Sequence, residues 1–197
     1  PILSKKVRFD KFKEIDISWR KSDMEPLIDK RILHFSGNTR SFVSLFAIIA
    51  DKENVINISN KSPRDLISCL SDIYDYQTSN SNSTNFETES VSKGLIKFAN
   101  RYDYLSMYPS RTGKNKDVIS MINLILRTRK INITILDLNT TFNQKTKWST
   151  GKLESMVKYK LVNEDSKLGP NNEKIYNVLD PKLMHLIKRG ITSLENN

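Results

Sequence analysis

The sequence contains few of the residues that build disulfide frameworks, metal centres or phosphate-binding loops. It has one cysteine, two histidines and six glycines among its 197 residues. The single cysteine, Cys69, excludes an intramolecular disulfide and a multi-cysteine zinc site, and it fits a reducing compartment such as the nucleus or the cytoplasm. The chain also has no EF-hand loop, no His-x-x-x-His pair and no glycine-rich phosphate loop. We therefore expect no metal and no cofactor.

Signatures of a catalytic centre are missing as well. A tyrosine recombinase would need an arginine three residues after His185, but Lys188 stands there and no tyrosine follows. We interpret His185 as a packing or surface histidine. The sequence therefore predicts a non-enzymatic protein without a small-molecule substrate.

Long hydrophobic runs are also absent. The longest apolar run, Phe42 to Ala50, is interrupted by Ser44. It is far shorter than the roughly 20 residues that a helix needs to cross a bilayer. We also find no secretory signal, and so we expect no membrane association.

Acidic residues are the scarcer charged type, and this imbalance is the first positive indication of function. The chain has 32 Lys and Arg against 22 Asp and Glu, a formal net charge of +10. Such an excess favours a polyanionic partner, although a merely solvated basic surface is the alternative.

Residues 71–90 hold four acidic residues and no basic one. Within this acidic region, the polar stretch Thr78–Thr88 predicts a flexible surface loop. Further along the chain, Pro109–Lys116 predicts a hinge between the two halves.

The pattern of predicted elements is most regular after Asp117. Apolar residues from Val118 to Ile125 have helical spacing, which predicts a helix that ends near Arg129. Residues 131–133 alternate as a short strand. Thr134, with an acidic residue three positions later, has the capping-box pattern that opens a second helix.

A third helix and a hairpin complete this half of the chain. Ser149 or Thr150 can cap the third helix, which would bury Leu153, Met156 and Val157 on its inner face. Strands are predicted at residues 161–163 and 175–178, with a hairpin loop at 164–174 between them. Asp180 and Pro181 open a last helix that stops at Gly190.

This order of elements resembles the winged-helix variant of the helix-turn-helix. The resemblance covers residues 117–190 and depends on the order and length of the elements. It implies that strand 131–133 pairs with the two strands of the hairpin, which is the wing. It also implies that the third helix enters the major groove of DNA.

The N-terminal half repeats the pattern loosely. A helix is predicted at Phe42–Ala50 and a strand at Val55–Ser59, whose sequence VINIS is echoed by KINIT at residues 130–134. Helices that begin at Ser62 and at Ser90 would follow, with a strand at residues 102–108. The alternative is a single winged helix packed on an unrelated helical half.

The predicted fold is thus α+β, mainly helical, with two winged-helix-like modules and small antiparallel wings. Residues 1–35 would form an N-terminal arm, with strand-like alternation at Ile15, Ile17 and Trp19. Residues 36–112 would form the first module with its acidic loop insertion, and residues 113–197 the second.

Lysine and hydroxyl side chains dominate the predicted outer face of the third helix. They suit phosphate contacts, and the lack of Arg, Asn and Gln on that face predicts weak sequence preference. Trp148 is expected to be partly buried where this helix begins. The residues expected to contact DNA are Lys145, Lys147, Ser149, Thr150, Lys152, Ser155 and Lys158 on this helix, Lys167 and Lys174 at the wing, and Lys93, Lys97, Arg101 and Arg111 in the first module.

The resemblance implies binding of double-stranded DNA within a larger chromosomal, replication or transcription assembly, and therefore a nuclear location, with the cytoplasm as the alternative. Winged helices also serve as docking modules, so a protein-binding scaffold is the second hypothesis. Residues 5–9, KKVRF, resemble the RVxF-type peptide that docks on the type-1 protein phosphatase. A strand of the arm explains the same five residues.

Overall fold

The computed structural model describes residues 19–107, 115–169 and 172–194. The helices of the N-terminal lobe are α1 (Lys21–Phe35), the 3-10 turn η3 (Val43–Leu45), α2 (Ile49–Ile58), α3 (Pro63–Asn80), α4 (Thr88–Asn100) and α5 (Tyr104–Met107). The C-terminal elements are α6 (Asn115–Thr128), β1 (Asn132–Ile133), α7 (Ile135–Phe142), α8 (Thr146–Lys158), β2 (Val162–Leu168), β3 (Lys174–Val178) and α9 (Pro181–Lys188). The expected α+β, mainly helical class with a small antiparallel sheet is confirmed.

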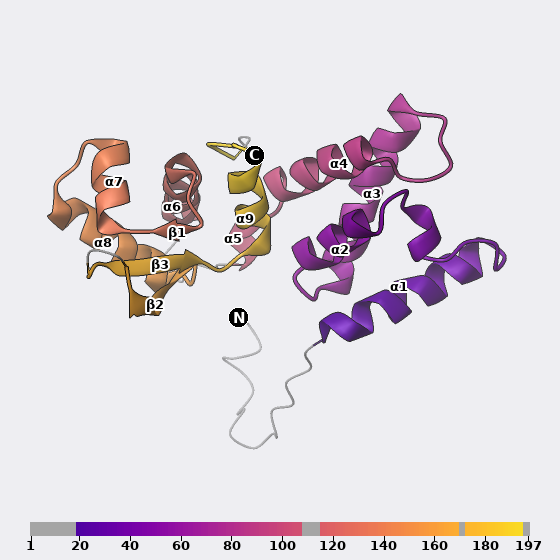
Figure 1. Cartoon of the computed structure of the whole chain (residues 1–197), viewed down its shortest axis with the longest axis horizontal. Helices are drawn as coiled ribbons and strands as arrows, with labels where there is room; N and C mark the ends of the chain where they lie inside the picture. The colour runs from indigo at the N-terminus through magenta and orange to yellow at the C-terminus, as the bar shows by residue number, and fades with distance from the viewer. Residues whose placement is uncertain (1–18, 108–114, 170–171, 195–197) are drawn as a thin grey trace, which may run out of the picture.

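The elements form two lobes that meet at α9. Helices α1 to α4 lie on one side, and α6 to α8 with the sheet lie on the other (Figure 1). Although α9 follows the sheet in sequence, it packs against α4 and α2 as well as against α6. Leu183, Leu186 and Ile187 of this helix are buried. The two lobes therefore share one continuous hydrophobic core.

Close packing of α3 against α4 organises the N-terminal lobe. Ser62 caps α3 by accepting a hydrogen bond from the Asp65 backbone amide, with Pro63 at the first helical position. Gly94 lies in α4 where the two helices cross, and a Cβ there would meet the Ile73 Cα at 2.6 Å. The absence of a side chain thus allows the close approach.

The strands predicted for the N-terminal half are wrong. Val55–Ser59 belongs to the end of α2 and its C-cap, and residues 104–107 form α5. Val55, Ile56 and Ile58 are all buried, a pattern that a helix packed on two sides accommodates and an alternating strand does not. Among the described residues of this half, the only β pairing is an isolated bridge between Phe46 and Phe86.

Two other predicted segments also differ. Residues 42–50 are not one apolar helix: η3 covers only three of them, and Ile48 and Ile49 are exposed. The end of the predicted arm, residues 21–35, is helix α1, which buries Met24 and Ile28 in the core. The strand-like alternation at residues 15–17 and the KKVRF motif lie outside the described residues, as does most of the predicted hinge.

The polar stretch Thr78–Thr88 lies mostly at the surface, as predicted, but it is anchored to the core rather than loosely attached. Helix α3 continues through Asn80. Phe86 is buried, and its backbone amide donates to the Leu45 carbonyl at 2.6 Å while its own carbonyl accepts from Ala47. The buried Gln77 side chain accepts from the Glu87 amide and donates to the Ser83 carbonyl. The buried Phe86 ring and the side-chain amide of Gln77 therefore hold this loop in place.

The C-terminal lobe follows the predicted order of elements closely. Helix α6 buries Val118, Met121, Ile122 and Ile125, as their spacing indicated. The capping box at Thr134 is present, since its hydroxyl accepts from the Asp137 amide and the Asp137 carboxylate accepts from the Thr134 amide.

The sheet has the order β1-β3-β2, and both pairings are antiparallel. Strand β1 therefore pairs with β3 alone, not with both strands of the hairpin as predicted. The strands also extend further than expected, because β2 reaches Leu168 and β3 begins at Lys174. The shorter turn results from cross-strand pairs such as Glu164 with Tyr176, which continue the ladder into polar residues.

Candidate nucleic-acid interface

Helix α8 is the element that presents most of the predicted DNA-binding residues. It is anchored by Leu153 and Met156, which are buried in the core. It begins at Thr146, three residues before the predicted cap. Ser149 consequently lies inside the helix, where it is fully buried and its hydroxyl donates to the Asn139 side chain at 2.6 Å. The prediction that Ser149 faces DNA is therefore wrong, because this hydroxyl joins α8 to α7 instead.

The outer face of α8 carries charged side chains around a glycine. Lys147, Glu154 and Lys158 are exposed, and Gly151 lies between them on the same face. A Cβ at Gly151 would meet no atom within 4 Å, so the surface is open there. Val157, predicted to face inward, is 39% exposed because the inner face is narrower than expected.

A shallow depression lies over the preceding turn and the first three turns of α8. It is lined by Asn143, Gln144, Lys145, Lys147, Trp148, Gly151, Lys152 and Ser155. Trp148 is half-buried, as predicted, and its ring packs on Phe142. The Lys152 ammonium lies 5.7 Å from the Trp148 ring centroid, within cation–π range. The depression thus combines lysines with an aromatic surface and contains no carboxylate.

The N-terminus of α8 adds a partial positive charge to this depression. The N-cap residue is Lys145, which makes no side-chain hydrogen bond to the first-turn amides. Such amides, at the positive end of the helix dipole, favour anions.

The other two hydroxyl side chains of α8 that are expected to contact DNA are less accessible. Thr150 and Ser155 are half-buried, and the Ser155 hydroxyl donates to the Gly151 carbonyl.

The two lysines of the β2–β3 hairpin differ in their availability. Lys174 forms an ion pair with Glu164 on the neighbouring strand at 2.9 Å, and this contact raises the pKa of the lysine. Lys167 is exposed and forms no ion pair with any described carboxylate. Lys167 therefore lacks a close ion-pair partner among the described residues, although its charge helps lower the pKa of Asp165.

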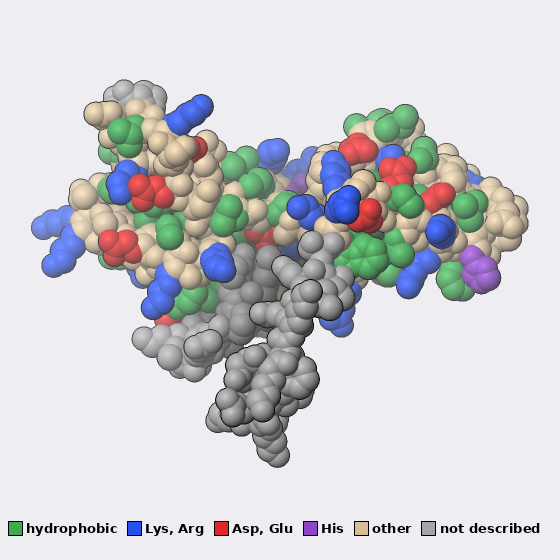
Figure 2. Space-filling view, turned by 90° about the horizontal axis from the view of Figure 1, so that it is seen from below, with side chains coloured by type: hydrophobic (Ala, Val, Ile, Leu, Met, Phe, Trp, Pro, Cys, Tyr) green, Lys and Arg blue, Asp and Glu red, His purple; other side chains and the backbone are tan. Residues whose placement is uncertain are grey.

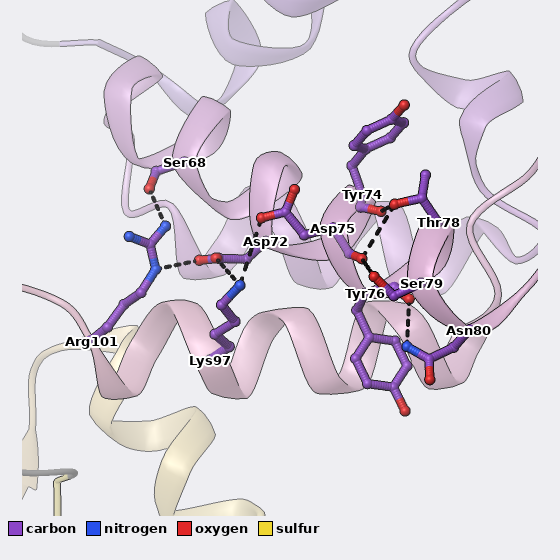
Figure 3. Close-up of polar contacts among 10 residues, drawn as sticks. All are labelled: Ser68, Asp72, Tyr74, Asp75, Tyr76, Thr78, Ser79, Asn80, Lys97 and Arg101. Atoms are coloured by element: carbon purple, nitrogen blue, oxygen red, sulfur yellow. Dashed lines mark hydrogen bonds and ion pairs between the residues drawn. The ribbon is translucent and has the colours of Figure 1, made fainter.

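In the N-terminal lobe, two of the predicted cations share one buried carboxylate. Asp72 of α3 lies between Arg101, whose Nε is 2.7 Å from its oxygen, and Lys97, whose Nζ is 3.2 Å away (Figure 3). Arg101 also donates to Ser68, and Lys97 is 3.6 Å from Asp75. These ion pairs connect α3 to α4, although both basic side chains remain about half exposed. Their contact with DNA stays a prediction.

The remaining two predicted residues of this lobe are Lys93 and Arg111. Lys93 is exposed on α4, whereas Arg111 lies outside the described residues. The acidic cluster that neutralises their neighbours was visible in the sequence at residues 71–90. The sequence does not show that this cluster lies beside α4, because that position depends on how α3 packs against α4.

Basic side chains occur over both lobes of the molecule. In Figure 2 they extend along the outer end of the C-terminal lobe, with acidic side chains interspersed. Sequence reasoning missed Asn143 and Gln144, which also line the α8 depression. Their place in a polar turn directly before a basic helix was the signal that could have indicated them.

Comparisons with known proteins identify no relative. A scan against protein-family models finds no match, and searches of curated proteins and of solved structures find none either. Within the described ranges, no cluster of three or more His, Cys, Asp or Glu side chains is arranged to hold a metal ion. No described helix has the length and apolar character needed to cross a membrane.

Proposed function

We propose that residues 115–188 form a winged-helix module that binds duplex DNA through α8. The element order α6, β1, α7, α8, β2, β3 supports the fold part of this proposal, as does the sheet order with β3 in the centre. In this arrangement α8 is the recognition helix and the β2–β3 hairpin is the wing.

The observation that carries the proposal is the distribution of unpaired cations. Lys145, Lys147 and Lys158 of α8 are exposed and form no ion pair with a described carboxylate. Elsewhere, Lys97, Lys130 and Lys174 are each paired with a carboxylate. Free lysines can release the counterions condensed on DNA, whereas paired ones must first give up a partner. Unpaired cations also occur elsewhere, as at Lys93, Lys188 and Arg189, but the three on α8 lie on the helix that the fold would place in the groove.

Phosphate contacts of this kind fix position more than sequence. The exposed face of α8 offers lysines, a glycine and one glutamate, and therefore few side chains that read base edges. We propose weak sequence preference, and membership of a nuclear assembly that supplies further specificity. The nuclear part of the proposal is an analogy at the level of the fold.

The test is a duplex-binding titration at several salt concentrations. The variant Lys145→Ala/Lys147→Ala/Lys158→Ala should lower affinity and flatten the slope of log affinity against log salt by roughly 2 to 3. The matched control is Lys97→Ala/Lys130→Ala/Lys174→Ala, which removes the same formal charge from paired positions. It should change the slope much less. Equal slopes for the α8 variant and the parent, with both proteins folded, would overturn the proposal.

Protein docking is the second candidate, because several apolar side chains of this lobe are exposed, two of them on α7 and α8. Leu136 of α7 is 57% exposed, and Val157 of α8 is 39% exposed. If the parent binds no duplex even at low salt, this reading replaces the first. Docking through an apolar surface would then depend little on salt and would weaken in a Leu136→Ser/Val157→Ser variant.

A further inference from the structure

A second basic groove lies far from α8 in sequence, between α2 and α9. Its polar lining consists of Asn54 and Asn57 from α2 and His185, Lys188 and Arg189 from α9 and the residue after it. The groove has a volume of about 350 Å³. It forms only where the two lobes meet, since α2 belongs to one lobe and α9 joins it to the other.

The lining of this groove carries positive charge and no negative charge. No carboxylate lines it, whereas the groove between α1 and α2 contains Glu25, Asp29 and Glu53. Lys188 and Arg189 are exposed and form no ion pair with any carboxylate that the structure describes. Together the lining offers two cationic groups and two side-chain amides, all of which can donate hydrogen bonds.

His185 adds a ring nitrogen to which no described residue forms a hydrogen bond. Its Nε2 atom is buried and has no hydrogen-bond partner among the described residues. Burial, Arg189 and Lys188 lower the pKa of His185 to about 4, so the ring is neutral at physiological pH. A buried ring nitrogen without a partner is unfavourable unless something else satisfies it.

The helix dipole explains only part of this arrangement. Cations in the last turn of a helix, such as Lys188, are stabilised by the nearby carbonyl groups. That effect requires neither the two asparagines on the facing helix nor an unpaired imidazole nitrogen beside them. An anion with several acceptor oxygens satisfies all of these groups together.

We propose that the groove between α2 and α9 binds a phosphate group, with Lys188 and Arg189 providing the charge and His185, Asn54 and Asn57 donating hydrogen bonds. A phosphate oxygen accepts from the His185 Nε2–H, and the remaining oxygens face the cations and amides. Charge-assisted hydrogen bonds of this type are the strong ones. The phosphate belongs either to a nucleic-acid backbone or to a small phosphorylated molecule. No α8 residue lines this groove, so the two proposed binding sites can be tested independently.

The test follows the His185 and asparagine side-chain signals of the full chain by NMR in phosphate-free buffer. Inorganic phosphate should shift these signals in a saturable way and should raise the pKa of His185, because the bound anion stabilises the imidazolium. The Lys188→Ala/Arg189→Ala variant should weaken this binding by about tenfold or more. Both side chains are exposed, so its fold should be retained.

Controls separate this site from α8 and identify the source of the phosphate. The variant Lys145→Ala/Lys147→Ala/Lys158→Ala should leave the phosphate response unchanged. If a short duplex shifts the same signals at much lower concentration, the phosphate is that of nucleic acid; if only inorganic phosphate does so, the ligand is small. The proposal is overturned if neither ligand moves the His185 signals. It is also overturned if the Lys188→Ala/Arg189→Ala variant responds as the parent does.

Discussion

At the scale of single residues, two glycines inside helices have opposite surroundings. Gly94 of α4 lies against the backbone of Ile73, and a Cβ there would be 2.6 Å from the Ile73 Cα. Gly151 of α8 has open space where its Cβ would be. The same substitution at the two positions therefore separates helix propensity from packing.

We expect Gly94→Ala to destabilise the protein and Gly151→Ala to stabilise it. Alanine favours a helix over glycine by about 1 kcal/mol, which should appear almost fully as a gain at Gly151. At Gly94 the clash forces α3 and α4 apart, and overpacking of this kind typically costs about 1 to 3 kcal/mol. Urea denaturation of both variants measures the difference. A stabilised Gly94→Ala variant would contradict the close crossing of the two helices.

At the scale of elements, the loop between α3 and α4 shows how little sequence is needed to fix a polar segment. Nearly all residues from Thr78 to Thr88 are polar, yet Phe86 is buried against Phe46, with ring centroids 5.5 Å apart. Its backbone also bridges to the segment that leads into α2. The loop thereby ties α3 and α4 to the residues before α2.

Phe86→Ala should lower the free energy of unfolding by about 3 kcal/mol, because a buried aromatic ring is lost and a cavity remains. Thr84→Ala, two residues earlier, should change stability by less than about 0.5 kcal/mol, since Thr84 is exposed. Thermal or urea denaturation gives both values. If the two variants are equally stable, the loop does not pack as described.

At the scale of the whole molecule, a buried ion cluster joins the lobes. Lys182 of α9 is fully buried, and its Nζ lies 3.4 Å from Asp65 of α3 and 3.6 Å from Asp180. It also lies 4.2 Å from the ring centroid of Tyr102. Burial raises the pKa of Asp180, while Lys182 opposes that rise. One lysine thus compensates carboxylates from two parts of the chain.

Lys182→Met should destabilise the protein by about 3 to 5 kcal/mol, because it leaves the buried Asp180 and the partly buried Asp65 without this counter-charge. Adding Asp180→Asn should restore part of the loss, since one uncompensated charge is then removed while Asn can still cap α9. Urea denaturation of the single and double variants provides the test. A single variant as stable as the parent would show that the cluster does not hold the lobes together.

The sequence alone determined features that depend on neighbours along the chain. The Thr134–Asp137 capping box, the Asp180–Pro181 helix start and the apolar face of α6 all appear where their patterns predicted them. Caps and helical faces follow from spacings of three or four residues, which any reader of the sequence can see. The C-terminal lobe, built mainly from such local signals, was therefore the predictable one.

Only the tertiary structure decided which side chains remain free. Val55–Ser59 and residues 130–134 have similar sequences, yet one lies largely in a helix and the other partly in a strand, because burial on two sides overrides weak β propensity. Lys97 and Arg101 are basic in the sequence, but only the fold shows that Asp72 of α3 lies between them. Charge is a property of sequence, but its neutralisation depends on residues that meet only after the chain has folded back on itself.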